Sequence, residues 1–351
     1  MSQALSSQPF NLALSADFFT ASGEPQYKEM GLDLLAGQGH IHWAPFAEHR
    51  GEVGADQIDG VNGLIALTPA VTAKSLQGAG HLLAIARFGV GYDMVDVPAC
   101  TEADVALLIA TGAVDRPVAE ATVGWMIALT HHMRIKDQLL RQGRWAERSG
   151  YMGRELRQRT FGAVGLGGIA RAVLKLLAPF DMNPPLAFDP YADPEVARSL
   201  GVELVELDAL MERADFVSVH CPLNDQTKGL IGAEQLARMK GDAYLINTAR
   251  GGIVDEEPLY QALAQDRIAG AALDCFVGEP IESPHPFGEL DNVLLAPHSI
   301  AWTDELFRDI GRMAVQNMID LSLGRPPRGV VNPEVLQRPG FQEKWNRVRG
   351  G

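Results

Sequence analysis

The sequence predicts an α/β fold with two parallel-sheet domains, and three observations point to it. Short apolar runs alternate with helical patterns along most of the 351 residues. A glycine-rich turn between a strand pattern and a helix pattern lies halfway along the chain, at residues 163–170. About 150 residues precede that turn, which is enough chain for a separate domain. We therefore expect two doubly wound sheets, the second built around this turn.

The first domain is predicted from four short apolar runs, each bounded by Gly, Pro or Asp. They are Leu12 to Leu14, Leu64 to Leu67, Leu82 to Ala86 and Val105 to Ile109. Their lengths are typical of strands in a small parallel sheet. A long amphipathic helix is then expected from Pro117 to about Leu140, and this helix would bridge the two domains.

The turn at residues 163–170 has the pattern of a dinucleotide-binding loop. Gly165 permits a tight turn, Gly167 lets the backbone approach a pyrophosphate, and Ala170 stands in the third glycine position. The apolar stripe that follows predicts a helix, and its first residues, Gly168 and Ile169, would present backbone amides to the phosphates. We therefore expect a Rossmann cofactor domain.

Asp189 supplies the second half of this fingerprint. It follows the apolar run Leu186 to Phe188 and lies about 20 residues beyond the turn, where a carboxylate binds the ribose hydroxyls of adenosine. A carboxylate repels a 2′-phosphate, and no Arg follows Asp189 directly, so NAD is favoured over NADP. The alternative is a plain βαβ unit in which Asp189 caps the turn before Pro190.

Composition narrows the class of protein. The net charge of −14 argues against non-specific nucleic-acid binding, and 46% hydrophobic residues suffice for two cores. The cysteines Cys100, Cys221 and Cys275 show no CxxC spacing, so neither disulfides nor a metal site is predicted. The first ten residues lack a signal-peptide pattern, and no apolar run has the length of a membrane span. A cytoplasmic protein without a membrane or nucleic-acid partner is expected.

Four more apolar runs after Asp189 predict further strands of the cofactor domain. They are Phe216 to His220, Ala243 to Asn247, Ala271 to Asp274 and Val293 to Ala296. In an open parallel sheet, ligands bind beyond the carboxyl ends of the strands. The residues just after these strands are therefore candidates for a functional site.

Three groups with complementary chemistry follow these strands, namely Arg250, Glu279 and His298. Arg presents a planar fork to a carboxylate, His exchanges a proton near neutral pH, and a neighbouring carboxylate stabilises the charged imidazole. Together they suit hydride transfer to a keto acid. Each also has a structural interpretation. Arg250 could neutralise a cofactor phosphate, Glu279 could be an exposed loop acid, and His298 could cap a helix that begins near Thr303.

Several motifs resemble the D-isomer-specific 2-hydroxyacid dehydrogenases over roughly residues 60 to 335. They are Arg87 to Asp93, Val118 to Glu120, the turn at 163–170, Val219 to Leu223, Asn247 to Asp255, Asp274 to Pro280 and Ala296 to His298. The sequence departs from the family pattern at three positions. Thr111 stands where Pro is usual, Ala170 replaces the third Gly, and Cys275 stands where Val is usual.

The resemblance implies roles for residues at the matching positions. Arg250 would bind the substrate carboxylate and carbonyl oxygen, His298 would be the acid/base, and Glu279 would pair with His298. Asp274 would contact the nicotinamide carboxamide. The other implied cofactor contacts are Thr122, Cys221, Pro222, Thr227, Thr248 and Ala249. Gly89, Val90 and Gly91 would receive the substrate carboxylate on backbone amides, although an ordinary turn with positive φ explains the same glycines.

The resemblance also implies the domain arrangement and the activity. Residues 1–112 and 300–335 would form a flavodoxin-like substrate domain, residues 113–299 the inserted NAD-binding domain, and residues 336–351 a tail on the surface. The implied protein is an NAD-dependent oxidoreductase that interconverts a D-2-hydroxy acid and its 2-oxo acid, and it is implied to be a homodimer through the cofactor domain. The alternatives are a NAD-sensing binding protein like the corepressors of this fold, or a relative that oxidises formate or phosphite.

Overall fold

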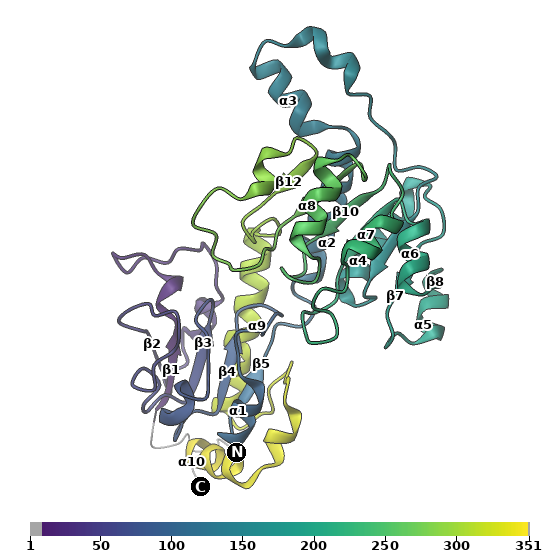
Figure 1. Ribbon diagram of the computed structural model, residues 1–351. Coiled ribbons are helices and arrows are strands. Elements are labelled where there is room, and N and C mark those ends of the chain that lie inside the picture. Colours follow the sequence, from purple (N-terminus) through teal and green to yellow (C-terminus); the bar gives the residue numbers. More distant parts are fainter. Residues whose placement is uncertain (1–8, 350–351) are drawn as a thin grey trace. The chain divides into compact units, whose positions relative to one another are not determined.

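The computed structural model of the chain describes residues 9–349 and divides into two compact units. Unit 1 combines the residues up to Val114 with those from Trp302 onward, and unit 2 comprises Asp115–Ala301. Figure 1 shows the chain leaving unit 1 through unit 2 and returning to unit 1. Among the described residues no helix is both long and apolar enough to cross a membrane.

Unit 1 contains a five-stranded sheet in which every pairing is parallel. Its strands are β1 (Phe10–Leu14), β2 (Ile41–Pro45), β3 (Gly63–Ala66), β4 (Ala84–Arg87) and β5 (Ala106–Leu108). The strand order β2-β1-β3-β4-β5 is that of a flavodoxin-like sheet, as predicted. The sequence did not predict β2, an edge strand that is exposed after Ile41 and so lacks a buried apolar run.

The described residues of unit 1 form the α-helices α1 (Val97–Glu102), α9 (Asp304–Ser322) and α10 (Pro339–Arg349). The expectation of a surface tail is wrong for α10, because Phe341 and Trp345 on this helix are buried. The indole nitrogen of Trp345 donates a 2.8 Å hydrogen bond to the carbonyl of Leu321 at the end of α9. Lys344 donates to the carbonyls of Leu82 and Ala103. The C-terminal segment is thus part of the packed unit.

Unit 2 contains a seven-stranded sheet, again with parallel pairings throughout. The strands are β6 (Phe161–Val164), β7 (Leu186–Phe188), β8 (Glu203–Leu204), β9 (Phe216–Val219), β10 (Tyr244–Asn247), β11 (Gly270–Leu273) and β12 (Val293–Leu295). Their order in the sheet is β12-β11-β10-β9-β6-β7-β8. The chain adds β7 and β8 on one side of β6 and then returns to add β9 to β12 on the other side, so the strand order reverses between β6 and β9. This is the Rossmann arrangement that the glycine turn predicted, and ligands bind at such a reversal point.

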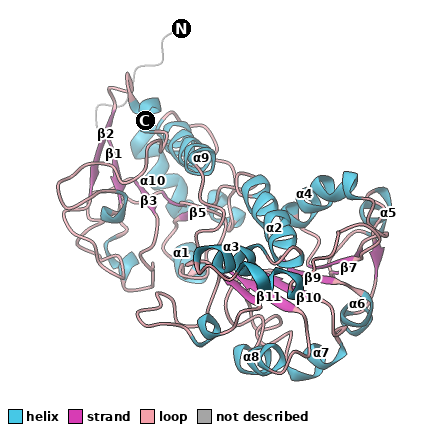
Figure 2. Cartoon of the chain, turned by 90° about the horizontal axis from the view of Figure 1, so that it is seen from above, coloured by secondary structure: helices cyan, strands magenta, loops and turns pink. Residues whose placement is uncertain are grey.

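Helices cover both faces of this sheet. The α-helices of unit 2 are α2 (Asp115–Thr130), α3 (Met133–Arg141), α4 (Gly168–Leu177), α5 (Pro194–Ser199), α6 (Leu207–Arg213), α7 (Ala233–Arg238) and α8 (Glu256–Ala264). Figure 2 shows α2 and α4 on one face and α6, α7 and α8 on the other. Each face has its own buried core, one containing Met126 and Val173 and the other Leu210, Leu236 and Leu259. The sheet is therefore doubly wound, and the loops that follow its strands lie at its carboxyl edge.

The long helix expected from Pro117 to Leu140 is interrupted. His132 adopts a left-handed conformation with φ 52°, which ends α2 and starts α3 in a new direction. Both helices belong to unit 2, so neither bridges the units. In Figure 1, α3 carries the chain away from the sheet of unit 2 as a projecting arm.

Candidate cofactor and acid–base site

The glycine turn after β6 lies against the loop after β9. Gly165 has φ 97°, and a Cβ on this residue would lie 2.8 Å from the amide nitrogen of Cys221. Both the left-handed backbone and this close approach require glycine. The turn therefore lies at the point where the strand order reverses.

The amino end of α4 is open, as a pyrophosphate site requires. Gly167 is the N-cap residue, and no side chain caps the helix there. A Cβ on Gly167 would meet no atom within 4 Å, whereas Ala170 one turn later is fully buried. The first amides of the helix, beginning with Gly168 and Ile169, thus have room for an anion.

Asp189 holds the glycine turn and also caps its own turn. One carboxylate oxygen accepts a 2.8 Å hydrogen bond from the amide of Leu166, and the other accepts from the amide of Tyr191 at 2.9 Å. Asp189 therefore does cap the turn before Pro190, as the alternative interpretation expected. Each carboxylate oxygen can still accept one more hydrogen bond, so cofactor binding is not excluded. The carboxylate remains available to ribose hydroxyls.

Asp115 is a residue of this region that the sequence did not indicate. It is the first residue of α2, and its carboxylate fills the space that a side chain on Gly168 would need. Burial raises the pKa of Asp115 above its ordinary value. A second acid therefore lies beside the amino end of α4. No local pattern predicts it, because the contact joins two helices that are far apart in sequence.

Several uncharged polar groups line the neighbouring strand ends. Burial raises the pKa of the Cys221 thiol to about 11 and lowers the pKa of His220 to about 4, so both are neutral at physiological pH. The ring nitrogens of His220 and the hydroxyl of Thr248 are buried and meet no hydrogen-bond partner among the described residues. Such orphaned polar atoms fit a site that a polar cofactor completes. Thr227 differs, because its hydroxyl donates to the carbonyl of Pro222 at 2.6 Å.

Two other predicted cofactor residues are buried. Thr122 is fully buried on α2 and its hydroxyl donates to the carbonyl of Val118 at 2.8 Å, so it offers a ligand no surface here. Asp274 accepts hydrogen bonds from the amides of Ser299 and Ile300 at 2.8 and 3.2 Å. Burial nevertheless raises the pKa of Asp274 to about 6.

The loop after β10 positions Arg250. The side chain of Asn247 accepts from the amide of Ala249 at 3.0 Å and donates to the carbonyl of Arg250 at 2.8 Å, which fixes a tight turn. A Cβ on the next residue, Gly251, would collide with the backbone of Phe276. The loops after β10 and β11 are therefore packed together.

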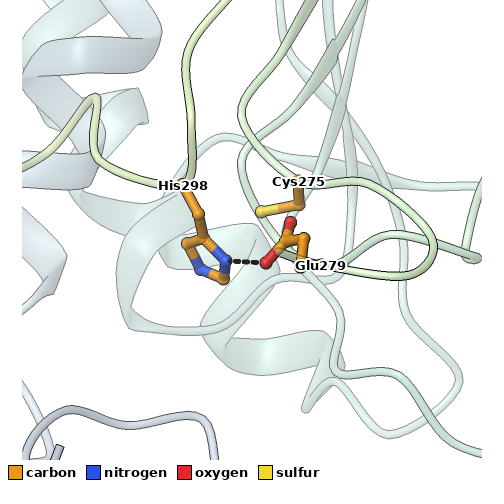
Figure 3. Close-up of side chains that lie close together, drawn as sticks. All are labelled: Cys275, Glu279 and His298. Carbon is orange, nitrogen blue, oxygen red and sulfur yellow. Dashed lines mark hydrogen bonds and ion pairs between the residues drawn. The ribbon is translucent and has the colours of Figure 1, made fainter. Parts of the chain in front are cut away.

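Glu279 and His298 form the centre of the candidate site. Glu279 Oε1 accepts from the amide of Phe276 at 2.7 Å, and Oε2 contacts Nδ1 of His298 at 2.7 Å (Figure 3). Burial acts to raise the pKa of Glu279, but the hydrogen bonds from His298 and Phe276 and the charge of Arg250 outweigh it and lower the pKa. Glu279 is thus an ionised carboxylate that orients the imidazole. His298 itself has φ 51°, a left-handed conformation often found at functional sites.

The three charged groups predicted from the strand ends therefore meet at one edge of the sheet of unit 2. They can bind an anionic group, exchange a proton and stabilise the protonated imidazole. Gly89, Val90 and Gly91 follow β4 in unit 1, and Gly89 has φ 140° as its turn requires. Their role in binding a substrate stays a prediction.

Comparisons with known proteins identify the family of the chain. Residues 123–299 match the family model of the D-isomer specific 2-hydroxyacid dehydrogenase, NAD binding domain. The chain is 39% identical to a glyoxylate reductase of Thermofilum pendens over 278 residues, which is 78% of this chain and 82% of that protein. It is 36% identical to a D-3-phosphoglycerate dehydrogenase of Archaeoglobus fulgidus over 272 residues, or 78% of this chain and 51% of the relative.

The comparison of structures agrees with the fold. A crystal structure of a protein from Thermus thermophilus aligns with a TM-score of 0.80 and 28% sequence identity, covering 92% of this chain and 100% of that one. The chain spans about half the length of the phosphoglycerate dehydrogenases that it matches and about four fifths of the glyoxylate reductases. The matched domain confirms the prediction of an NAD-binding fold.

Proposed function

This chain belongs to the D-isomer specific 2-hydroxyacid dehydrogenase family, and from that premise we propose that it interconverts a D-2-hydroxy acid and its 2-oxo acid with NAD(H). The observation that carries the proposal is the hydrogen bond between His298 Nδ1 and Glu279 Oε2 at the carboxyl edge of the nucleotide-binding sheet. An imidazole so oriented by a carboxylate is a general acid and base.

Each charged group has a proposed role in the reaction. The cofactor, when bound, would supply the hydride for the keto carbon. His298 gives a proton from Nε2 to the developing alkoxide, and Glu279 stabilises the imidazolium before the transfer. Arg250 pairs with the substrate carboxylate and polarises the carbonyl oxygen. In the oxidative direction His298 takes the hydroxyl proton.

The proposed cofactor residues lie in unit 2. The pyrophosphate would lie on the amides of Gly167, Gly168 and Ile169, beyond the tight turn at Gly165, whose own amide donates to the carbonyl of Phe188. Asp189 would bind the adenosine ribose and favour NAD over NADP. Cys221, Pro222, Thr227, Thr248, Ala249 and Asp274 complete the proposed set. The buried hydroxyl of Thr248, which meets no partner among the described residues, supports its inclusion. Thr122 has less support, because its hydroxyl already donates to the carbonyl of Val118.

A panel of 2-oxo acids tests the activity. NADH oxidation is measured with glyoxylate, hydroxypyruvate, pyruvate, aryl pyruvates and sugar-derived oxo acids, and D- and L-2-hydroxy acids are compared in the reverse direction. Turnover of at least one member, with D over L selectivity, is expected. NADH binding without any turnover contradicts the proposal and favours a NAD-sensing protein. NAD reduction with formate or phosphite instead would identify the other alternative.

We extend the proposal to a cytoplasmic homodimer that assembles through the cofactor domain. Apolar side chains are exposed on α3 and the segment after it, where a second copy would cover them. They are Met133, Leu140, Trp145 and Met152. No disulfide joins the three cysteines, which suits a reducing compartment. Sedimentation of the wild type and of Trp145→Ser tests the dimer, and a monomeric wild type contradicts it.

A further inference from the structure

A thiol lies beside the acid–base pair. The Sγ of Cys275, a carboxylate oxygen of Glu279 and a ring nitrogen of His298 all lie within 4.8 Å of one another (Figure 3). Cys275 and Glu279 come from the loop after β11, and His298 follows β12. Cys275 has no role in the proposed proton transfer. The thiol is therefore a group of this site that the proposed reaction does not use.

We propose that Cys275, Glu279 and His298 bind a zinc-like divalent cation that switches the enzyme off. Thiolate, carboxylate and imidazole are the three side-chain ligands that Zn²⁺ takes in proteins, with water as a fourth ligand. The inhibitory part of this inference rests on the proposed role of His298 as the acid/base.

The spacing of the three ligand atoms fits this ion after small adjustments. Tetrahedral Zn²⁺ holds its ligand atoms about 3.3 to 3.6 Å apart. The Nδ1 to Oε2 distance of 2.7 Å must widen by less than 1 Å. The Sγ of Cys275 lies at most 4.8 Å from the ligand atoms of Glu279 and His298, so it must approach them by about 1 Å. The thiol is 3% exposed, whereas the side chains of Glu279 and His298 are 32% and 41% exposed. An ion can thus enter past the exposed pair and bind the thiol beneath.

The local structure holds two of the ligands in place. Glu279 Oε1 accepts from the amide of Phe276, which leaves Oε2 toward His298. The Sγ of Cys275 lies 3.5 Å from the carbonyl of Ala249. The ligands therefore lose little rotamer freedom when the ion binds. The thiol selects against Mg²⁺ and Ca²⁺, which prefer oxygen ligands, and favours Zn²⁺ and Cd²⁺.

Coordination through Nδ1 explains inhibition in both directions. A metal on Nδ1 leaves the single ring proton on Nε2 and breaks the hydrogen bond with Glu279. The ring then has no imidazolium proton to give in reduction and no vacant nitrogen to accept one in oxidation. Because the ion occupies the Glu279 side of the ring, substrate binding through Arg250 persists. The expected signature is a fall in kcat with little change in KM.

Three proteins are compared in the test, after treatment with a chelator: the wild type, Cys275→Val and Cys100→Ala. Cys100 is a buried cysteine of unit 1 and serves as the matched control. Binding is followed by the ultraviolet charge-transfer absorbance of a cadmium–thiolate bond during titration with Cd²⁺. Inhibition is the ratio of kcat with and without Zn²⁺, taken within each protein, and a chelator should restore the original rate.

The wild type and Cys100→Ala should bind one Cd²⁺ with thiolate absorbance and lose about 100-fold in kcat with Zn²⁺. Cys275→Val should show neither effect. Absence of the absorbance in the wild type, or equal inhibition of Cys275→Val, overturns the metal site. Absorbance that depends on Cys275 without inhibition of an active enzyme keeps the metal site and overturns the role of His298. Cys275→Ala replaces the Val variant if thermal unfolding shows that Val does not fit.

Discussion

Two halves of the carboxyl edge of the unit 2 sheet differ in how they are built. The nucleotide half follows β6, β7 and β9, and its main features are a glycine turn, open helix amides and the Asp189 hydrogen bonds. The acid–base half follows β10, β11 and β12, and there charged side chains meet from three loops. Backbone geometry dominates the first half and side-chain chemistry the second. Substitutions in the two halves should therefore change different kinetic constants.

His298→Gln is the strongest test of this separation. Glutamine retains polarity and similar size but cannot give or take the proton, so kcat should fall by about 100-fold or more. The glycine turn and Asp189 are untouched, and NADH should bind with an affinity within about twofold of the wild type. Steady-state kinetics and NADH fluorescence titration measure the two quantities. Near-normal turnover would remove His298 from the mechanism.

Glu279→Gln should produce a smaller loss in the same half. A glutamine keeps one oxygen to accept from Phe276, but its amide group faces Nδ1 of His298 and no longer stabilises the imidazolium. We expect kcat to fall by roughly tenfold to a hundredfold with unchanged NADH affinity. Glu282→Gln, an exposed acid nearby in sequence, controls for the loss of one charge. Equal effects of the two substitutions would contradict the pairing.

The two halves were predictable from the sequence for different reasons. Gly165 and Asp189 belong to a motif whose residues are fixed by spacing along one βαβ unit. Arg250, Glu279 and His298 were predicted because parallel strands bring their carboxyl ends to one edge. That prediction required neither the order of the strands in the sheet nor any side-chain contact. The Nδ1 to Oε2 bond itself is a tertiary contact that only the structure shows.

Apart from the exposed strand β2, the missed features named below depend on contacts between distant segments. Asp115 lies beside Gly168 because α2 packs against α4, and Cys275 points toward His298 because β11 and β12 are neighbours. The helix α10 carries only two buried apolar anchors, Phe341 and Trp345, so its periodicity is weak and packing on α9 decides its structure. Local patterns contain none of this information.

Gly165→Ala tests the nucleotide half. The alanine must adopt φ near 97° with its Cβ 2.8 Å from the nitrogen of Cys221, so the turn shifts or stays strained. A cost of about 1 to 3 kcal/mol should weaken NADH binding by roughly 5-fold to 150-fold. The kcat at saturating NADH should change much less than in the His298 variant. Calorimetry of NADH binding and saturation kinetics check this, and a loss confined to kcat would contradict the division of the edge.

Asp115→Asn should have the smallest effect, and in the opposite direction. The carboxylate lies beside the amino end of α4, where the proposed pyrophosphate carries negative charge. A unit charge about 6 Å from another in water contributes about 0.7 kcal/mol, so the variant should bind NAD⁺ about threefold more tightly at neutral pH. Burial raises the pKa of Asp115, so as the pH falls through that raised value the wild type becomes neutral there. The two proteins should then converge in affinity at low pH and differ most at high pH.

Asp137→Asn on the exposed arm makes the same change of net charge and should leave the affinity unaltered. Weaker NAD⁺ binding by Asp115→Asn than by the wild type at high pH would show that the carboxylate supports the turn and does not repel the cofactor.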